Sequence, residues 1–357
     1  MTHAIVPPYL LARIASVQEP TWAHAAEAAR TTLAASRDYH TPRTRLRLSI
    51  DAPGTLVAEA APAPDRTIFD AKGRETLPGT RVRGEDDPPT ADEAVDEAFD
   101  GLGATFDFYS QAYGRNGIDA AGGALEATVH YGRNYDNAFW NGERMVFGDG
   151  DGEVFTGFTG SLTVIAHELT HGVTEHEGGL DYSGQSGALN ESLSDVFGAL
   201  VEQYALTQTV EAASWLIGAG IFTPAVQGTA LRSLKAPGTA YDDDVLGRDP
   251  QPAHMDHYVK TTDDNGGVHI NSGIPNHAFY LTASALGGHA WERAGLIWYR
   301  ALTGDLPSSA DFATFAAATL KAAGAEYGET SKEAAAVRAG WVGVGVLEDD
   351  RSRTARG

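Results

Sequence analysis

The hydrophobic periodicity of the chain changes close to residue 160, and this change restricts the fold more than any other feature. Before it, apolar residues alternate over 125–131 and form a short run at 145–147, as in strands, with one helix expected over 90–114. After it, apolar residues recur every three to four positions. That spacing predicts helices over 161–176, 190–204, 272–286, 290–302 and 310–323. Strands followed by helices predict an α+β fold, with a strand-rich N-terminal domain (66–160) and a mostly helical C-terminal domain (161–347) that meet at a cleft.

The first fifty residues differ in charge from the remainder of the chain. Residues 1–50 contain six arginines and three acidic residues, whereas the full chain has a net charge of −22. An Ala/Pro-rich stretch over 51–65 has the composition of a linker. We therefore expect 1–50 to be a separable segment with one amphipathic helix over 20–37, although periodicity equally allows a small docking helix of the main domain. Residues 348–357 are expected to be a frayed tail.

Composition excludes several classes of protein. The chain has 357 residues, of which 42% are hydrophobic and 21% charged, as expected of a folded protein. It contains no cysteine, which excludes disulfides, thiolate nucleophiles and cysteine-ligated zinc. Its negative charge argues against nucleic acid or an anionic membrane surface as partner. The N-terminal apolar run is broken at Pro7 and Arg13, so it does not resemble a Sec signal peptide. This leaves the compartment open: we expect secretion by a route without a Sec signal peptide, with a cytoplasmic location as the alternative.

Two histidines and a glutamate form the most informative motif. His167 and His171 are four residues apart in a helical pattern, so both imidazoles project from one face and can chelate one Zn²⁺. Glu168 lies beside them, where it suits a general base for a zinc-bound water. Such a pentad occurs by chance in roughly a few per cent of chains this long, so two ordinary surface histidines are the alternative.

A second motif can supply the third ligand that a catalytic zinc site requires. Residues 190–195 read NESLSD at the start of the next predicted helix. Glu191 would complete a His₂Glu zinc site with one open position, and Asp195, one turn later, can accept a hydrogen bond from a ligating histidine. The alternative is that Asn190 is a helix N-cap followed by ordinary acidic residues.

The two motifs belong to a longer ordered set that resembles the thermolysin-like neutral zinc metallopeptidases over roughly residues 66–345. The set comprises HELTHGVTEHEGGLDYSGQSGALNESLSD (167–195), NAFW (137–140), LRSL (231–234) and DNGGVHINSGIPNHAFYL (264–281). Residues 5–14, IVPPYLLARI, resemble the short propeptide of the protealysin-like branch.

The resemblance implies roles for individual residues. His167, His171 and Glu191 match the zinc ligands and Glu168 the general base. Further matches are Tyr182 and His269, which hydrogen-bond the oxyanion, Asp264, which orients His269, and Asn190 and Asp195 behind the ligands. Substrate contacts are implied for Arg232, which binds a carbonyl, and for Asn137 and Ala138, on which a peptide lies as an added strand. The implied pocket consists of Phe155, Phe158, Val164, Ile217, Ile221 and Leu231.

Together these matches predict a zinc-dependent endopeptidase that acts on proteins or peptides and prefers bulky hydrophobic residues after the scissile bond. Phe158 stands where a smaller aliphatic residue is usual and should narrow the pocket. The chain is expected to be an autoprocessed zymogen whose propeptide is an intramolecular inhibitor, and a proteinaceous inhibitor is a further expected partner.

One departure from the family concerns calcium. Of the acids that hold a pair of calcium ions in thermolysin, only Glu202 is retained here, while Thr163, Ser214 and Ala219 replace three others. We therefore expect the double site to be lost. Calcium bound by other acids of this acidic chain stays an open alternative, to which we assign no residues. The three aspartates at 242–244 are expected in a solvated loop and the HMDH sequence at 254–257 in a structural loop.

Two other functions remain as alternatives. One is a non-catalytic peptide-binding protein that keeps zinc as a clamp, but a clamp needs none of Glu168, Tyr182 and His269. The other is a zinc aminopeptidase, which needs an acidic anchor for a free amine, and the sequence has no recognisable motif for one.

Overall fold

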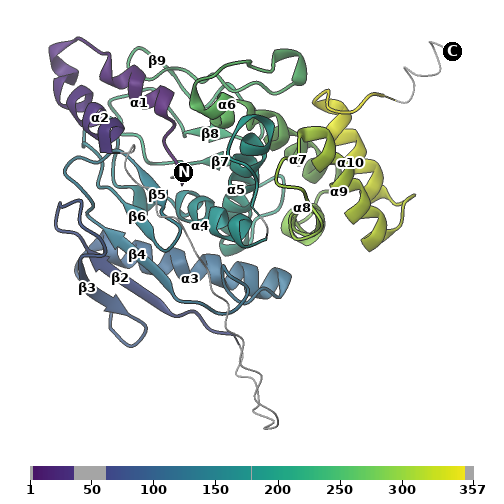
Figure 1. Cartoon of the computed structure of the whole chain (residues 1–357), viewed down its shortest axis with the longest axis horizontal. Helices are drawn as coiled ribbons and strands as arrows, with labels where there is room; N and C mark the ends of the chain where they lie inside the picture. Colours follow the sequence, from purple (N-terminus) through teal and green to yellow (C-terminus); the bar gives the residue numbers. More distant parts are fainter. Residues whose placement is uncertain (1–2, 36–61, 178, 350–357) are drawn as a thin grey trace, which may run out of the picture.

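The computed structural model describes residues 3–35, 62–177 and 179–349. It confirms the α+β fold: Figure 1 shows a sheet on one side of the molecule, two long helices in the middle and a group of helices on the other side. Most of the expected linker (51–65), the end of the expected propeptide and residues 350–357 of the tail lie outside the described residues.

A mixed sheet of six strands occupies the N-terminal half, in the order β1-β5-β6-β4-β2-β3. The strands β2, β4 and β6 are parallel, and antiparallel strands border them. The edge strand β1 comes from the N-terminal segment and pairs antiparallel with β5. The strands are β1 (His3–Ala4), β2 (Arg66–Asp70), β3 (Thr80–Gly84), β4 (Leu125–Val129), β5 (Ala138–Trp140) and β6 (Met145–Phe147).

The helix α3 (Glu93–Tyr113) packs against the sheet and against the central helices. Asp92 caps its first turn by accepting hydrogen bonds from the backbone N–H groups of Ala94 and Val95. Gly114 ends it in the left-handed conformation, with φ of 67°. The helix expected over 90–114 is thus confirmed.

Two central helices, α4 (Leu162–His176) and α5 (Gly184–Ala205), pack closely along their length. Most of their side chains are buried on every face, which is typical of helices at the centre of a protein. Gly198 allows the close approach, because a Cβ there would lie 2.8 Å from the backbone oxygen of Thr163. The prediction that α5 begins at Asn190 was wrong: it begins at Gly184, so Asn190 is inside the helix and is not its N-cap.

The remaining helices form the C-terminal side of the molecule (Figure 1). They are α6 (Asp264–Asn271), α7 (Gly273–Leu286), α8 (Leu296–Leu302), α9 (Phe312–Tyr327) and α10 (Lys332–Gly343). The helix expected over 290–302 begins as a π-helical turn (Trp291–Gly295). The helix α10 was not predicted, because alanines and glycines give it little hydrophobic contrast, yet its Trp341 stacks on Trp298 in the core at 5.9 Å.

The N-terminal segment is docked on the main body. It contains α1 (Pro8–Ala15), a 3₁₀ turn (Pro20–Trp22) and α2 (Ala23–Ala35), so the helix expected over 20–37 is split and α1 was missed. The Ala25 N–H donates to Glu153 Oε2 at 3.0 Å, and the Asp136 N–H donates to Thr32 Oγ1 at 3.0 Å. Leu11, with other apolar residues of α1, is buried in the main core.

Short elements complete the fold, and two of them, β9 and η3, fall in the loops predicted at 242–244 and 254–257. They are β7 (Leu216–Ile217), β8 (Arg232–Ser233), β9 (Asp242–Asp243), β10 (Gly247–Arg248), η2 (Phe158–Gly160) and η3 (Met255–His257). The aspartates at 242–244 form part of a hairpin and not simply a solvated loop, because Asp243 accepts hydrogen bonds from the backbone of the turn.

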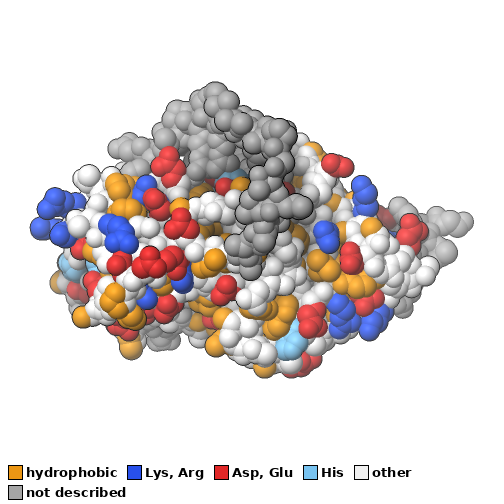
Figure 2. Space-filling model, turned by 90° about the horizontal axis from the view of Figure 1, so that it is seen from below, with side chains coloured by type: hydrophobic (Ala, Val, Ile, Leu, Met, Phe, Trp, Pro, Cys, Tyr) orange, Lys and Arg blue, Asp and Glu red, His pale blue; other side chains and the backbone are white. Residues whose placement is uncertain are grey.

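Acidic and basic side chains are interspersed on the one face of the molecule that Figure 2 shows. On the face shown in Figure 2, Lys and Arg form small separate groups among Asp and Glu, and no broad basic area is visible. Within the described ranges, no helix has both the length and the apolar composition required to cross a membrane.

Candidate active site

Two histidines of α4 face each other at the centre of the molecule. The Nε2 atoms of His167 and His171 are 3.1 Å apart, and both rings are fully buried. His167 Nδ1 lies 2.8 Å from Asp195 Oδ1, and His171 Nδ1 lies 2.8 Å from Asn190 Oδ1. Because both Nδ1 atoms face acceptors, each Nε2 presents a lone pair to the other. These lone pairs repel each other, and a cation bound by both nitrogens removes the repulsion.

Glu191 of α5 brings a carboxylate to the same point. Its Oε2 is 3.5 Å from His167 Nε2, and its Oε1 is 3.6 Å from His171 Nε2. Oε2 is buried and has no hydrogen-bond partner within the described ranges. Two imidazole nitrogens and a carboxylate are the donors that Zn²⁺ takes in catalytic sites, so this group fits zinc.

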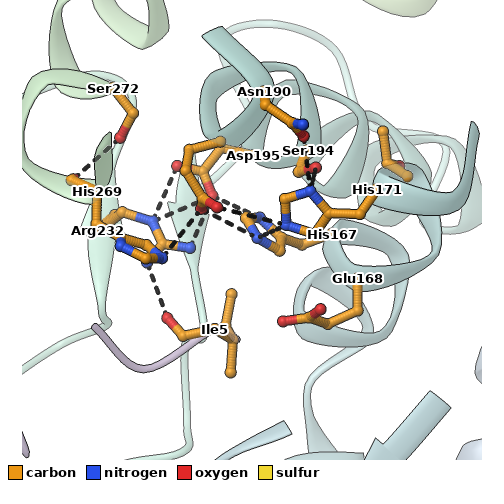
Figure 3. A network of polar contacts seen from close by, with 12 residues as sticks. Ile5, His167, Glu168, His171, Asn190, Ser194, Asp195, Arg232, His269 and Ser272 are labelled. Atoms are coloured by element: carbon orange, nitrogen blue, oxygen red, sulfur yellow. Dashed lines mark hydrogen bonds and ion pairs between the residues drawn. The ribbon is translucent and has the colours of Figure 1, made fainter. Parts of the chain in front are cut away.

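Glu168 projects from α4 beside the two imidazoles (Figure 3). Its Oε2 accepts a hydrogen bond from the backbone N–H of Trp140 at 2.9 Å, while Oε1 is buried without a partner among the described residues. Burial raises the pKa of Glu168 to about 8. A cation bound nearby would favour the ionised carboxylate. The unpartnered Oε1 is then available to accept a proton from a reactant.

Asp195 is the centre of a buried polar network (Figure 3). Besides contacting His167, it accepts hydrogen bonds from Arg232 Nε and Nη2, each at 2.9 Å, and from Asn276 Nδ2 at 2.8 Å. Burial opposes ionisation, but Arg232 and then His167 hold the pKa of Asp195 below its usual range. The network therefore fixes both the tautomer of His167 and the position of Arg232.

Tyr182 and His269 both lie next to the Glu191 carboxylate. The Tyr182 hydroxyl donates to Glu191 Oε1 and is 3.3 Å from His269 Nε2. Asp264 accepts from the His269 backbone N–H at 2.9 Å and lies 2.6 Å from its Nδ1. Asp264 reaches both atoms because it and Asn265 adopt left-handed conformations, with φ of 51° and 52°, which are uncommon for non-glycine residues.

The residues expected to hold a peptide substrate hold the N-terminal segment of the chain itself. The Ile5 N–H donates to the Ala138 carbonyl at 3.1 Å, and Asn137 both accepts from Val6 N–H at 2.9 Å and donates to its carbonyl at 3.1 Å. Arg232 Nη1 donates to the Ile5 carbonyl at 3.0 Å, as Figure 3 shows. Asn137, Ala138 and Arg232 thus bind a strand in the way the resemblance implies for a peptide.

The six predicted pocket residues are all buried in one apolar cluster, which also contains Ile5 and Val6 of the N-terminal segment. The rings of Phe155 and Phe158 are 5.6 Å apart. The cluster is formed by Phe155, Phe158, Val164, Ile217, Ile221 and Leu231 together with many other core residues.

Four residues of the site were not singled out from the sequence. Ser194 lies 3.1 Å from His171 Nδ1, Asn276 contacts Asp195, and the backbone of Trp140 contacts Glu168. These three are inside motifs quoted above, so closer reading of those motifs was the available signal. The fourth, His3, has a ligand atom within 4.8 Å of those of His171 and Glu191, and a lone histidine near a terminus gave no signal.

The positions of the missing calcium acids are occupied by neutral contacts. Thr163 Oγ1 accepts from the Gly218 N–H at 2.9 Å, and Ser214 donates to Glu202 Oε2 at 3.3 Å. Burial raises the pKa of Glu202, although the Ser214 hydroxyl opposes the shift.

Comparison with known proteins identifies the family. Residues 58–175 match a model described as the thermolysin metallopeptidase catalytic domain, and residues 178–346 match its alpha-helical domain. The chain belongs to the thermolysin metallopeptidase family. It is therefore a metalloendopeptidase of a zinc-dependent family. The two matched ranges meet near residue 176, and our division at residue 160 stays a prediction.

Individual relatives place the chain close to protealysin. It is 50% identical over 344 residues to an extracellular metalloprotease of Pectobacterium carotovorum subsp. carotovorum, covering 96% of each chain. It is 50% identical over 289 residues to Protease PrtS of Photorhabdus sp. (strain Az29), covering 80% of this chain and 78% of the relative. A solved structure, the precursor of protealysin from Serratia proteamaculans, matches with a TM-score of 0.86 and 49% identity, covering 97% of this chain and all of that one.

Proposed function

We propose that this chain is a zinc endopeptidase made as a latent precursor, in which His167, His171 and Glu191 hold the metal. The observation that carries the proposal is the approach of two imidazole Nε2 lone pairs to 3.1 Å beside a buried, unpartnered carboxylate oxygen. Without a cation these buried groups would lose their hydration and gain few hydrogen bonds in exchange, whereas zinc would bind all three.

The chemistry assigns separate tasks to the neighbouring residues. Zinc, when bound, polarises the scissile carbonyl and lowers the pKa of a water to about 7. Glu168 takes the proton of the attacking water and returns it to the leaving amine, while the Trp140 N–H holds its other oxygen in place. Tyr182 and His269 donate hydrogen bonds to the oxyanion, and Asp264 orients His269 for this purpose.

The substrate binds as an antiparallel strand on β5. Asn137 and Ala138 contact its backbone, and Arg232 binds a carbonyl next to the scissile bond. The pocket of six apolar residues takes that residue's side chain and favours bulky hydrophobic ones, with Phe158 narrowing the space. The contacts of Ile5 and Val6 support this assignment, because the same groups hydrogen-bond the backbone of this extended segment of the chain.

We further propose that residues 1–50 are a propeptide, joined by the 51–65 linker, that blocks the cleft until it is removed by self-cleavage. The β1 pairing with β5 and the docking of α1 and α2 support this, as does the likeness to a protealysin precursor. A separate proteinaceous inhibitor is a further proposed partner. The extracellular name of the relative supports secretion, by a route without a Sec signal peptide.

Zinc is the one metal to which this proposal assigns residues. The presence of Thr163, Ser214 and Ala219, which supply no carboxylates, supports the loss of the thermolysin double calcium site and leaves calcium at other acids open.

The test combines zinc content with cleavage mapping. Purified wild type is incubated with an unfolded protein, and the new termini are identified by mass spectrometry. We expect cuts before bulky hydrophobic residues, abolished by a zinc chelator and by Glu168→Ala, which should still bind one zinc. Cleavage by Glu168→Ala at the wild-type rate would overturn the mechanism, and zinc binding without any cleavage by wild type would favour the non-catalytic peptide-binding protein.

A further inference from the structure

The backbone of His269 is held by side chains on both sides of the residue. In α6, Asn265, Gly266 and Gly267 have left-handed conformations, with φ of 52°, 89° and 77°, so His269 lies in the first turn of right-handed helix. Backbone N–H groups of a first turn have no acceptor within the helix. Here Asp264 accepts from the His269 N–H at 2.9 Å. The position of His269 thus depends on side-chain contacts and not on the helix alone.

The carbonyl of His269 accepts hydrogen bonds from two further side chains. Gln251 Nε2 donates to it at 2.7 Å, and the Ser272 hydroxyl donates to it at 3.0 Å, a contact that Figure 3 shows. Gln251 Nε2 also donates to Ser272 Oγ at 3.0 Å. Both lone pairs of the carbonyl and both hydrogens of the amide are therefore used. These contacts set the orientation of the Gln251 amide, because its nitrogen faces two acceptors.

Gln251 is itself held in place by a buried loop. It is 4% exposed, and its backbone N–H donates to Asp249 Oδ1 at 3.0 Å. The other oxygen of Asp249 accepts from the backbone N–H groups of Gly238 and Ala240 at 3.0 and 3.1 Å. The backbone of the loop is thus fixed on either side of Asp249. The amide of Gln251 therefore presents a fixed donor to His269.

Stability alone does not account for an amide at this position. Gln251 Oε1 is buried and has no hydrogen-bond partner among the described residues. A buried acceptor without a partner costs free energy, and an apolar side chain of the same length would avoid that cost. What the amide adds is its nitrogen, which is directed at the carbonyl of His269.

We propose that Gln251 is a positioning residue, whose amide fixes the backbone of His269 and so the place where the His269 ring meets the oxyanion. This inference rests on the proposed function, in which His269 donates a hydrogen bond to that oxyanion. His269 Nε2 lies 3.3 Å from the Tyr182 hydroxyl and 3.5 Å from Glu191 Oε2, beside the proposed metal ligands. A donor stabilises the oxyanion at hydrogen-bond distance, so a small shift of the His269 backbone lowers the rate.

The experiment measures kcat and KM of Gln251→Met, which keeps the length of the side chain and removes the donor. Each variant is produced as the full chain and matured by a trace of tagged wild type that is then removed, and intact mass gives the matured fraction. We expect kcat per matured chain to fall about 10- to 100-fold, since removal of an oxyanion donor costs about 100- to 1,000-fold. KM should change by less than about twofold, because the oxyanion forms in the transition state and not in the bound substrate.

A double-mutant cycle separates positioning of His269 from a general structural role. In the His269→Ala background, Gln251→Met should lower kcat by less than about twofold, because the residue through which Gln251 acts is gone. An equal fall in both backgrounds, or an unchanged kcat in Gln251→Met alone, would overturn the proposal. If His269→Ala leaves kcat unchanged, the role of His269 in the proposed function fails instead.

Gln203→Met is the matched control. Gln203 is 1% exposed, and its side-chain nitrogen and oxygen have no partner within the described ranges. It lies on α5, about 18 Å along the helix from Glu191, so kcat should stay within about twofold of wild type.

Ser272→Ala is the second variant if circular dichroism shows that Gln251→Met does not fold. It removes the other donor to the His269 carbonyl. It should lower kcat in the wild-type background and leave it unchanged in the His269→Ala background. An unchanged kcat in the wild-type background would then overturn the proposal.

Discussion

Asp195→Asn tests whether one buried carboxylate organises the site. Asp195 is fully buried and accepts hydrogen bonds from three partners, namely His167, Arg232 and Asn276. An asparagine of the same shape keeps one oxygen and replaces the other with a donor. At least one of the three partners then faces a donor, and the buried guanidinium of Arg232 loses its counter-charge.

The expected cost follows from these contacts. Breaking a buried ion pair by neutralising one partner costs about 3–5 kcal/mol, because the remaining charge is uncompensated. Arg232 is fully buried, so this range applies without reduction for solvent. Loss of the group that orients His167 should lower zinc affinity about 10- to 100-fold, which is about 1.4–2.7 kcal/mol.

Both quantities are measured in the full-length Glu168→Ala precursor. Urea unfolding gives the change in the free energy of unfolding, and competition with a chelator gives zinc affinity. Asp256→Asn is the control, because its side chain is 82% exposed and 3.4 Å from His254, so it should change neither quantity by more than about 1 kcal/mol. A loss below about 1 kcal/mol for Asp195→Asn, with unchanged zinc affinity, would refute the reasoning.

Four further predictions concern pH, docking, specificity and calcium. Burial and then Asp151 raise the pKa of Asp136 from 3.8 to about 9, so the folded chain holds a proton that the unfolded chain has lost. Stability should therefore fall as pH rises from about 4 to about 9, and urea titrations should show a smaller fall in Asp136→Asn. Leu11→Ala should weaken docking of the N-terminal segment by about 2–5 kcal/mol. The segment should then be lost faster, as measured by intact mass over time. Phe158→Val should raise kcat/KM for peptides with the largest residues after the scissile bond relative to those with alanine there. Calcium chelation at constant zinc should leave the melting temperature of the precursor unchanged, as measured by calorimetry.

Each of these four predictions would be contradicted by one specific result. An equally steep loss of stability in Asp136→Asn would place the titrating group elsewhere, and an unchanged rate of mass loss in Leu11→Ala would mean that α1 does not limit release. If Phe158→Val alters all substrates alike, this residue does not line the pocket. A clear drop in melting temperature on calcium removal would indicate a site formed by other acids.

The sequence predicted the central helices and the metal centre because their signals are local. His167 and His171 share a helix face by spacing alone, and the motif containing Glu191 lies on the adjacent helix. The α+β order of strands and helices was equally visible. The start of α5 at Gly184 was hidden by its glycines, and α10 by its lack of apolar contrast.

The contacts of the N-terminal segment were not visible in the sequence. Val6 and Asn137 are separated by 131 positions, and Ile5 and Arg232 by 227. No periodicity reports such pairings, since they depend on how β1 extends the sheet. The charge difference indicated a separable segment, but His3 gave no local sign that it enters the cleft. The position of the N-terminal segment thus depends on long-range packing, which the local sequence pattern does not report.

The central claim is that this chain is a zinc endopeptidase held latent by its own N-terminal segment. The most direct measurement follows intact mass and peptidase activity together over time at neutral pH, in wild type and in Glu168→Ala. We predict that wild type loses an N-terminal piece of roughly fifty residues and gains activity at the same rate, while Glu168→Ala does neither. Full activity of wild type while its mass remains that of the entire chain would contradict the account.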